Sequence, residues 1–270
     1  MRRAGTPRGG VQPRRRRGYD GGHDPKTVPP PAMTDRLPAL ICLPPAGAGA
    51  SNFRPWMRRD AAVMAPALPG RDARLREEAP ATMTARAACL AAELAPALPP
   101  RYGLFGYSMG GTLACLLARE LAARGLPGPE VVFVLGALPP DRLADGTRRL
   151  DLLERDSAGF WKEIARMGGT PAELLQDAGL RALFEPVLRA DFAACAAGRI
   201  PPGPPLDCPV EVFAARGDHV VSRDEAQGWA RFTRATMRLH PLEGGHMLDR
   251  PQLDALLPRL RGLWPVAPAA

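Results

Sequence analysis

The sequence predicts an α/β fold with a mostly parallel central sheet and helices on both of its faces. Two observations support this fold class. Short and almost purely apolar runs at residues 40–43, 131–135 and 210–214 are typical of strands that are buried on both faces of a sheet. Longer segments with helical periodicity, at residues 81–97 and 109–124, alternate with these runs, which favours parallel strands joined by crossover helices.

Three further runs complete the predicted sheet. Residues 61–68 form an apolar run that ends at Pro69. Residues 102–107 form a strand that leads directly to Ser108, and residues 236–240 form a weaker strand.

The strand signal is absent from about residue 139 to residue 205. Amphipathic segments at residues 160–167, 172–177 and 180–195 take its place, so we expect an all-helical insertion between two strands of the sheet. In an enzyme such an insertion would form a lid over the active site. A long crossover connection without a gating role is the alternative.

The positive charge of the chain is concentrated at its N-terminus. Residues 1–32 carry seven Arg and one Lys against two Asp and thus supply most of the net charge of +8. Residues 1–36 have no apolar pattern, so we expect a disordered basic tail before a single domain over residues 37–265. A translation start at Met33 and a functional basic tail are the alternatives. The rest of the chain is nearly neutral, which argues against nucleic-acid binding.

The five cysteines indicate a reducing compartment. Their number is odd, no pair has C-x-x-C spacing and most lie in apolar stretches, where a free cysteine behaves as a small hydrophobic residue. We therefore expect a cytoplasmic protein without disulfides or bound metal. No apolar run approaches the roughly 20 residues of a membrane span, so we expect no membrane association. We also expect a monomer.

A candidate nucleophile lies between a predicted strand and a predicted helix. The segment Gly106-Tyr107-Ser108-Met109-Gly110 matches the pattern G-x-S-x-G in the context of the nucleophile elbow of the α/β-hydrolase fold. The two glycines allow the strand and the helix to approach closely, and the helix N-terminus brings free N–H groups near the serine oxygen. None of the other three serines has this context, so Ser108 is the predicted nucleophile.

The acid and the base of a triad are expected after the nucleophile, in that order. Asp218 follows the predicted strand at residues 210–214, at the end of the strand where α/β sheets place their sites. His246 lies in a loop after the last predicted strand, and two preceding glycines let this loop reach over the nucleophile. We therefore predict Asp218 as the acid and His246 as the base. The residues considered less suitable are Asp207 and Asp224 for the acid and His219 and His240 for the base.

An oxyanion hole needs two backbone N–H donors. One is expected from Met109, the residue after the nucleophile, and the other from the loop after the first strand. Pro44 and Pro45 in this loop have no N–H, which leaves Ala46 as the second predicted donor. A phosphate-binding loop is disfavoured because no Gly-Lys-Ser/Thr sequence follows.

These motifs resemble those of the type II thioesterases that serve polyketide synthases and nonribosomal peptide synthetases. The resemblance extends over roughly residues 37–263, and its helical motifs are the most diagnostic because ordinary esterases share only the elbow. It departs from the family pattern at Pro45, Ala48 and Tyr107. The segments that carry it are Pro44-Pro45-Ala46-Gly47-Ala48, Leu68-Pro69-Gly70-Arg71, Gly106-Tyr107-Ser108-Met109-Gly110-Gly111, Gly168-Gly169-Thr170-Pro171, Leu188-Arg189-Ala190-Asp191-Phe192 and Gly244-Gly245-His246.

The resemblance implies hydrolysis of acyl groups from the phosphopantetheine thioester of acyl or peptidyl carrier proteins, an editing function. Such a reaction requires no cofactor of the enzyme's own, because the substrate carries the phosphopantetheine. A general carboxylesterase or lipase, and an acyltransferase, would use the same triad and remain the alternative functions. A non-enzymatic scaffold would need no triad, so the predicted triad argues against it.

Overall fold

The computed structural model describes residues 37–149, 151–198, 200 and 203–265, and the predicted tail at residues 1–36 lies outside them. Six strands form a single sheet in the order β2-β1-β3-β4-β5-β6, and every neighbouring pair is parallel. This confirms the predicted α/β class. The strands are β1 (Ala39–Leu43), β2 (Val63–Met64), β3 (Tyr102–Tyr107), β4 (Val132–Leu135), β5 (Val210–Ala215) and β6 (Met237–Leu242).

Alternate residues of the central strands enter two separate cores. On β3, Leu104 packs into the core beneath one set of helices, whereas Phe105 packs into the core on the opposite face. The strand β4 repeats this alternation with Val132 and Phe133. Because side chains of a strand point to opposite faces in turn, both faces of a buried parallel sheet must be apolar, as the continuous runs predict.

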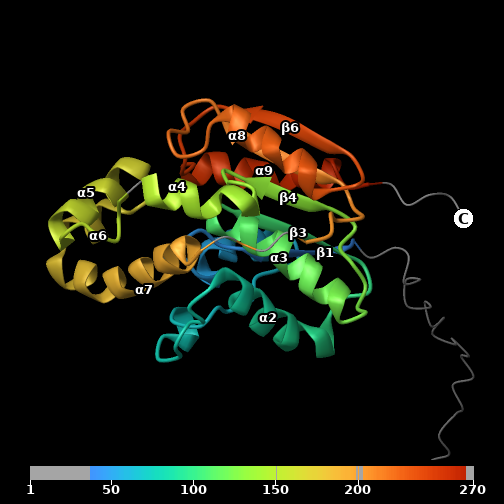
Figure 1. Cartoon of the computed structure of the whole chain (residues 1–270), viewed down its shortest axis with the longest axis horizontal. Coiled ribbons are helices and arrows are strands. Elements are labelled where there is room, and N and C mark those ends of the chain that lie inside the picture. Colours follow the sequence, from blue (N-terminus) through green and yellow to red (C-terminus); the bar gives the residue numbers. More distant parts are fainter. Residues whose placement is uncertain (1–36, 150, 199, 201–202, 266–270) are drawn as a thin grey trace, which may run out of the picture. The chain divides into compact units, whose positions relative to one another are not determined.

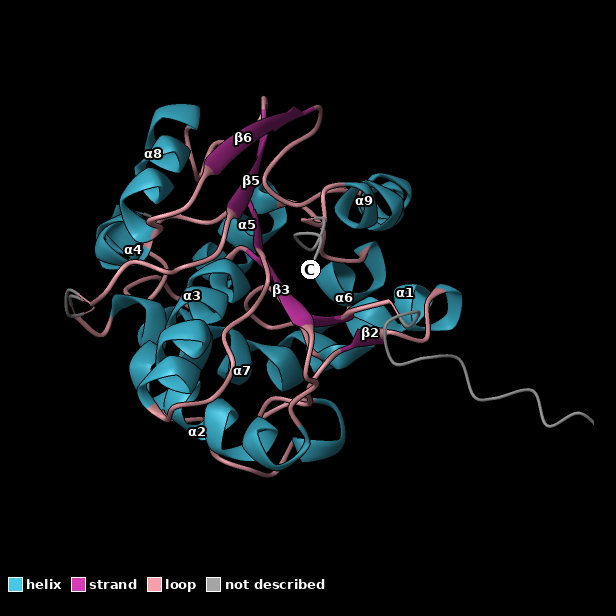
Figure 2. Cartoon of the chain, turned by 90° about the vertical axis from the view of Figure 1, so that its right-hand side faces the viewer, coloured by secondary structure: helices cyan, strands magenta, loops and turns pink. Residues whose placement is uncertain are grey.

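Helices cover both faces of the sheet (Figure 2). One face carries α2 (Met83–Leu94), α3 (Met109–Ala123) and α8 (Arg223–Gln227), and the other carries α1 (Arg54–Arg59) and α9 (Arg250–Gly262). Thr82 caps α2, because its hydroxyl accepts the N–H of Ala85. Because these strands are parallel, the connections that follow β3, β4 and β5 all begin at the same edge of the sheet.

Four helices separate β4 from β5 and gather to one side of the sheet, at the left of Figure 1. They are α4 (Leu143–Arg149), α5 (Ser157–Met167), α6 (Ala172–Gln176) and α7 (Ala178–Ala196). Their own core is small and aromatic, with Phe160 edge-on to both Trp161 and Phe192. We refer to α4–α7 as the helical insertion.

Two parts of the fold differ from the prediction. The strand predicted at residues 61–68 is wrong in length, since β2 comprises only Val63–Met64 at the edge of the sheet. Pro66 has no N–H and restricts the residue before it, so pairing with β1 ends there. The helix α9 was not predicted, although its buried leucines at positions 253, 256, 257 and 260 have helical spacing and Asp249 caps it.

Candidate active site

Ser108 occupies a strained turn between β3 and α3. Its φ of 51° and ψ of −118° are unusual for a residue with a side chain. A Cβ atom on Gly106 would lie 2.2 Å from the carbonyl oxygen of Gly110, and one on Gly110 would lie 2.2 Å from that of Leu43. Close packing of strand, turn and helix thus requires both glycines and holds Ser108 at the carboxyl end of the sheet.

The structure brings together the three residues predicted as a triad. Ser108 Oγ lies 3.0 Å from His246 Nε2, and His246 Nδ1 lies 3.0 Å and 3.1 Å from the two carboxylate oxygens of Asp218. The side chains of His246 and Asp218 are each 1% exposed. Because Nδ1 faces a carboxylate, it carries the imidazole proton, which leaves Nε2 as an acceptor for the serine hydroxyl.

Asp218 is itself held in position by the chain that follows it. Its Oδ1 accepts the backbone N–H groups of Val220 and Val221 at 2.8 and 2.9 Å. Hydrogen bonds from backbone donors fix the carboxylate against the imidazole. This is the arrangement that activates a serine as a nucleophile for acyl transfer.

The residues considered less suitable lie elsewhere. Asp207 is exposed and pairs with Arg234, and His219 is exposed. His240 lies 2.6 Å from the buried carboxylate of Glu211 and stacks on Phe213, which is a structural role. The exposed remainder comprises Asp224, Ser51, Ser157 and Ser222.

Tyr107 contacts the histidine loop in a way that the sequence did not identify. Its buried hydroxyl donates to the carbonyl oxygen of His246 at 3.1 Å and accepts the N–H of Leu248 at 2.5 Å. Burial raises the pKa of Tyr107, so the hydroxyl keeps its proton and its role as donor. The tyrosine therefore ties the histidine loop to the strand that bears the nucleophile. Two signals in the sequence pointed to this position: a polar atom in an otherwise apolar strand, and the departure from the family pattern at Tyr107.

The predicted oxyanion donors lie at the same pocket as the nucleophile. Ala46 and Met109 line it together with Ser108 and His246. Within the described part of the chain, the N–H groups of Ala46 and Met109 donate to no acceptor, unlike that of Ala48, which bonds to Pro45. Two free donors beside a serine hydroxyl are the chemical requirement of an oxyanion hole.

The pocket is apolar and is walled by two parts of the fold. The core supplies residues that follow β1, β3, β4, β5 and β6, and the helical insertion supplies the remaining lining residues. An apolar wall suits an acyl chain better than a charged or strongly polar group. The residues from the insertion are Leu143, Thr147, Met167, Phe192 and Cys195.

Several other features concern the described residues only. All five cysteines fall within them and are free thiols. No helix in these ranges is long and apolar enough to cross a membrane. Nor do three or more His, Cys, Asp or Glu side chains within them meet as a possible metal site.

Known proteins match this chain over nearly all of the described residues. The family model of the thioesterase domain matches residues 38–262. The thioesterase PikA5 of Streptomyces venezuelae is 32% identical over 215 residues, which are 77% of this chain and 74% of that protein.

Solved structures agree with this match. The RedJ thioesterase of the prodiginine pathway in Streptomyces coelicolor is 33% identical, with a TM-score of 0.78 over 88% of this chain and 97% of that one. YbtT, a type II thioesterase from the yersiniabactin pathway, is 29% identical, with a TM-score of 0.73 over 87% of this chain and 96% of that one. The predicted resemblance is therefore confirmed: this chain belongs to the thioesterase family and is a thioester hydrolase with the α/β-hydrolase fold.

Proposed function

We propose that this thioesterase removes acyl groups from the phosphopantetheine thioester of acyl or peptidyl carrier proteins, as an editing enzyme of polyketide or nonribosomal peptide synthesis. One observation carries the proposal: Ser108, His246 and Asp218 form a continuous chain of contacts, and its first two members line an apolar pocket. YbtT comes from a nonribosomal peptide and polyketide pathway, and RedJ from the prodiginine biosynthetic pathway, which supports the same class of partner.

In the proposed reaction, Ser108 Oγ attacks the thioester carbonyl while His246 Nε2 takes its proton. Asp218 stabilises the imidazolium that forms, and the N–H groups of Ala46 and Met109 bond the oxyanion. The C–S bond then breaks, and the thiolate takes the proton from His246. A thiol with a pKa of about 8.5 is a good leaving group near neutral pH.

Water completes the cycle. His246 removes a proton from water, the hydroxide attacks the acyl-serine, and the carboxylic acid leaves as Ser108 recovers its proton. The proton transfers and nucleophilic attacks in these steps use Ser108, His246 and water. Because His246 and Asp218 are almost fully buried, a thioester on a long flexible arm is well suited to reach Ser108.

The helical insertion would act as a lid in this scheme. It forms one wall of the pocket through α4, α5 and α7 but supplies none of the three triad side chains. Excluding water from the pocket strengthens the electrostatic interactions of the oxyanion hole.

The free thiols of the five cysteines support a cytoplasmic location.

The test is steady-state hydrolysis of acetyl- and longer acyl-carrier-protein thioesters beside the matching p-nitrophenyl esters. Wild type should prefer the carrier thioester, and Ser108→Ala should lose about 10⁴- to 10⁶-fold in kcat. The matched control is Ser157→Ala, an exposed serine of α5 that should retain wild-type turnover.

Three outcomes would overturn the proposal in different ways. A preference for the free esters, abolished in Ser108→Ala, would identify a general carboxylesterase or lipase. Formation of an ester or amide product when an alcohol or amine is added would identify an acyltransferase. Turnover that survives in Ser108→Ala would remove the serine from the mechanism.

A further inference from the structure

Asp191 is a fully buried carboxylate on α7, the last helix of the insertion. Arg71 donates to both of its oxygens at 2.7 Å, and Arg86 donates to Oδ1. A fourth donor is the backbone N–H of Gly47, 2.7 Å from Oδ2. Burial acts to raise the pKa of Asp191, but the guanidinium groups outweigh burial and hold the pKa below its usual value. The group is therefore ionised at neutral pH.

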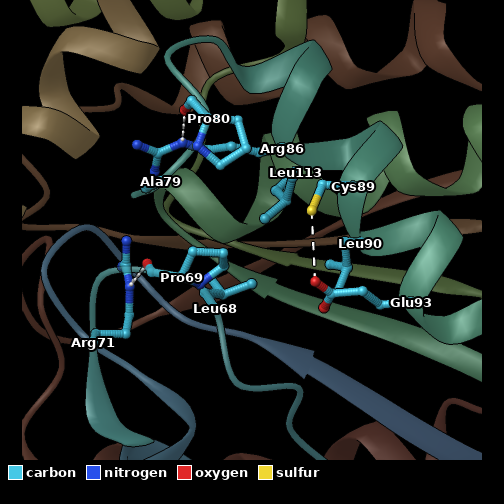
Figure 3. A pocket seen from close by; sticks show the side chains of 10 residues that line it. All are labelled: Leu68, Pro69, Arg71, Ala79, Pro80, Arg86, Cys89, Leu90, Glu93 and Leu113. Atoms are coloured by element: carbon cyan, nitrogen blue, oxygen red, sulfur yellow. Dashed lines mark hydrogen bonds between the residues drawn. The ribbon is translucent and has the colours of Figure 1, made fainter. Parts of the chain in front are cut away.

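Each arginine makes further hydrogen bonds to backbone carbonyl groups. Arg71 Nη1 also donates to the carbonyl of Ala48 at 3.0 Å, and Arg86 donates to the carbonyls of Pro80 and Ala190 at 2.9 and 3.1 Å. Figure 3 shows both arginines at the pocket beside α2, with the bond from Arg86 to Pro80. Asp191 therefore meets a rigid set of donors and cannot shift without breaking several charge-assisted bonds.

The network also reaches both residues predicted to supply the oxyanion hole. Gly47, bound to Asp191, follows Ala46 directly in the chain. A Cβ atom on Gly47 would lie 2.3 Å from Leu188 Cδ2, so α7 is packed tightly against this loop. On the other side, Arg86 Nη1 lies 3.8 Å from Met109 Sδ.

We propose that Asp191 is a positioning residue for the oxyanion hole: its bond to Gly47 holds the loop so that the Ala46 N–H faces the acyl carbonyl. The inference rests on the proposed attack by Ser108. It links the helical insertion to catalysis, because the acceptor for Gly47 belongs to α7.

The test compares Asp191→Asn with wild type on a small acyl-N-acetylcysteamine thioester, which needs no carrier protein. We expect kcat to fall by about 10- to 100-fold, at or below the roughly 10²- to 10³-fold loss caused by removing an oxyanion donor outright, while KM changes less than about two-fold. Affinity for a trifluoromethyl ketone analogue, whose hemiketal oxygen occupies the hole, should fall in parallel. Affinity for an unreactive thioether analogue should not change.

Glu185→Gln is the matched control on the same helix. Glu185 accepts bonds from Ser157, Trp161 and Arg189 and ties α7 to α5, but it has no bond to the loop of Ala46. This variant should lower the melting temperature yet keep kcat and ketone affinity within about two-fold. Equal losses of ketone affinity in both variants, or wild-type affinity in Asp191→Asn, would overturn the proposal.

A second variant covers the case in which Asp191→Asn does not fold. Asp191→Asn combined with Arg86→Gln keeps the net charge of the wild-type network, and the same loss of ketone affinity is expected from it. Wild-type affinity in this double variant would overturn the inference. If wild type fails to bind the ketone, or Ser108→Ala retains turnover, then the proposed function has failed, and the inference with it.

Discussion

The α/β core and the helical insertion contribute to the candidate site in different ways. The core supplies Ser108, Asp218 and His246 from the loops after β3, β5 and β6, where backbone packs directly on backbone at Gly106 and Gly217. The insertion supplies side chains that wall the pocket and has exposed apolar residues on its outside, such as Leu183, which is 53% exposed. Close backbone packing thus fixes the reacting atoms. The space for the substrate is formed by side chains, which can be substituted without a change of the backbone.

The largest expected effect tests the backbone packing of the core. Gly106→Ala would place a methyl group 2.2 Å from the Gly110 oxygen and 2.5 Å from Gly111 Cα. Because neither backbone can retreat without opening the elbow, the free energy of unfolding should fall by more than about 3 kcal/mol. Chemical denaturation measures this change.

Gly128→Ala is the control for this substitution. A Cβ atom at Gly128 has no neighbour within 4 Å, so the free energy of unfolding should change by less than about 0.5 kcal/mol. Similar losses in the two variants would contradict the close packing assigned to the elbow.

The next effect tests how the insertion is attached to the core. Asp191→Asn leaves Arg71 and Arg86 without their buried carboxylate and should lower the free energy of unfolding by about 3 kcal/mol at pH 7. Burial alone would raise the pKa of Asp191, but the two arginines hold this pKa below its usual value. A carboxylate with a lowered pKa stabilises the fold fully above the unfolded pKa of about 3.9, and the stabilisation is lost as the pH falls through the folded value.

Denaturation between pH 3 and pH 8 would measure this dependence. The difference between wild type and Asp191→Asn should be constant above about pH 5 and shrink below about pH 4. A difference that changed between pH 6 and pH 8 would instead point to a group that titrates near neutrality.

A smaller effect concerns the histidine loop. Tyr107→Phe removes the hydroxyl that bonds His246 and Leu248, and leaves these buried backbone groups unpaired, so the free energy of unfolding should fall by about 1–3 kcal/mol. We expect kcat to fall as well, because His246 would lose its fixed position. Thermal unfolding and steady-state kinetics measure the two effects.

Tyr102→Phe is a matched control at the other end of β3. The Tyr102 hydroxyl donates to the Pro127 carbonyl at 2.6 Å, away from the histidine loop. This variant should lose stability but keep its kcat. A kcat that fell equally in both variants would show that any damage to β3 lowers activity.

The smallest expected effect lies on the outside of the insertion. Leu183→Ala should change the free energy of unfolding by less than about 0.5 kcal/mol, because the side chain is already half exposed. The same substitution at the fully buried Leu113 of α3 should lower it by about 2–5 kcal/mol. A large loss for Leu183→Ala would mean that the outer face of the insertion is covered in solution.

The core and its site could be predicted because their signals are local. The apolar runs define β1, β3, β4 and β5 within one or two residues, and Ser108 is recognisable from its immediate neighbours. Asp218 and His246 each follow a strand, and parallel strands bring their carboxyl ends to one edge. The length of β2 was not predicted, because it is limited by Pro66, which lies within an otherwise apolar run.

The contacts of Asp191 could not be predicted in this way. Its partners Arg71 and Arg86 lie 120 and 105 positions earlier in the chain, in segments with no common pattern. Both Arg71 and Asp191 occur in motifs that resemble the family, but a motif does not show which other residues it contacts. An aspartate on the apolar face of an amphipathic helix, beside Leu188 and Phe192, was the one available signal.

The order of residues along one face of α7 has a consequence for how this enzyme could evolve a new substrate specificity. Leu188, Asp191, Phe192 and Cys195 are spaced so that they share one face of the helix, and this face both packs on the Gly47 loop and lines the pocket. A substitution that enlarges or narrows the pocket by moving α7 would also move the carboxylate that holds the loop. If Asp191 positions the loop as proposed, substrate range and turnover are coupled, and a change of acyl preference on α7 would select for compensating changes in residues 44–49.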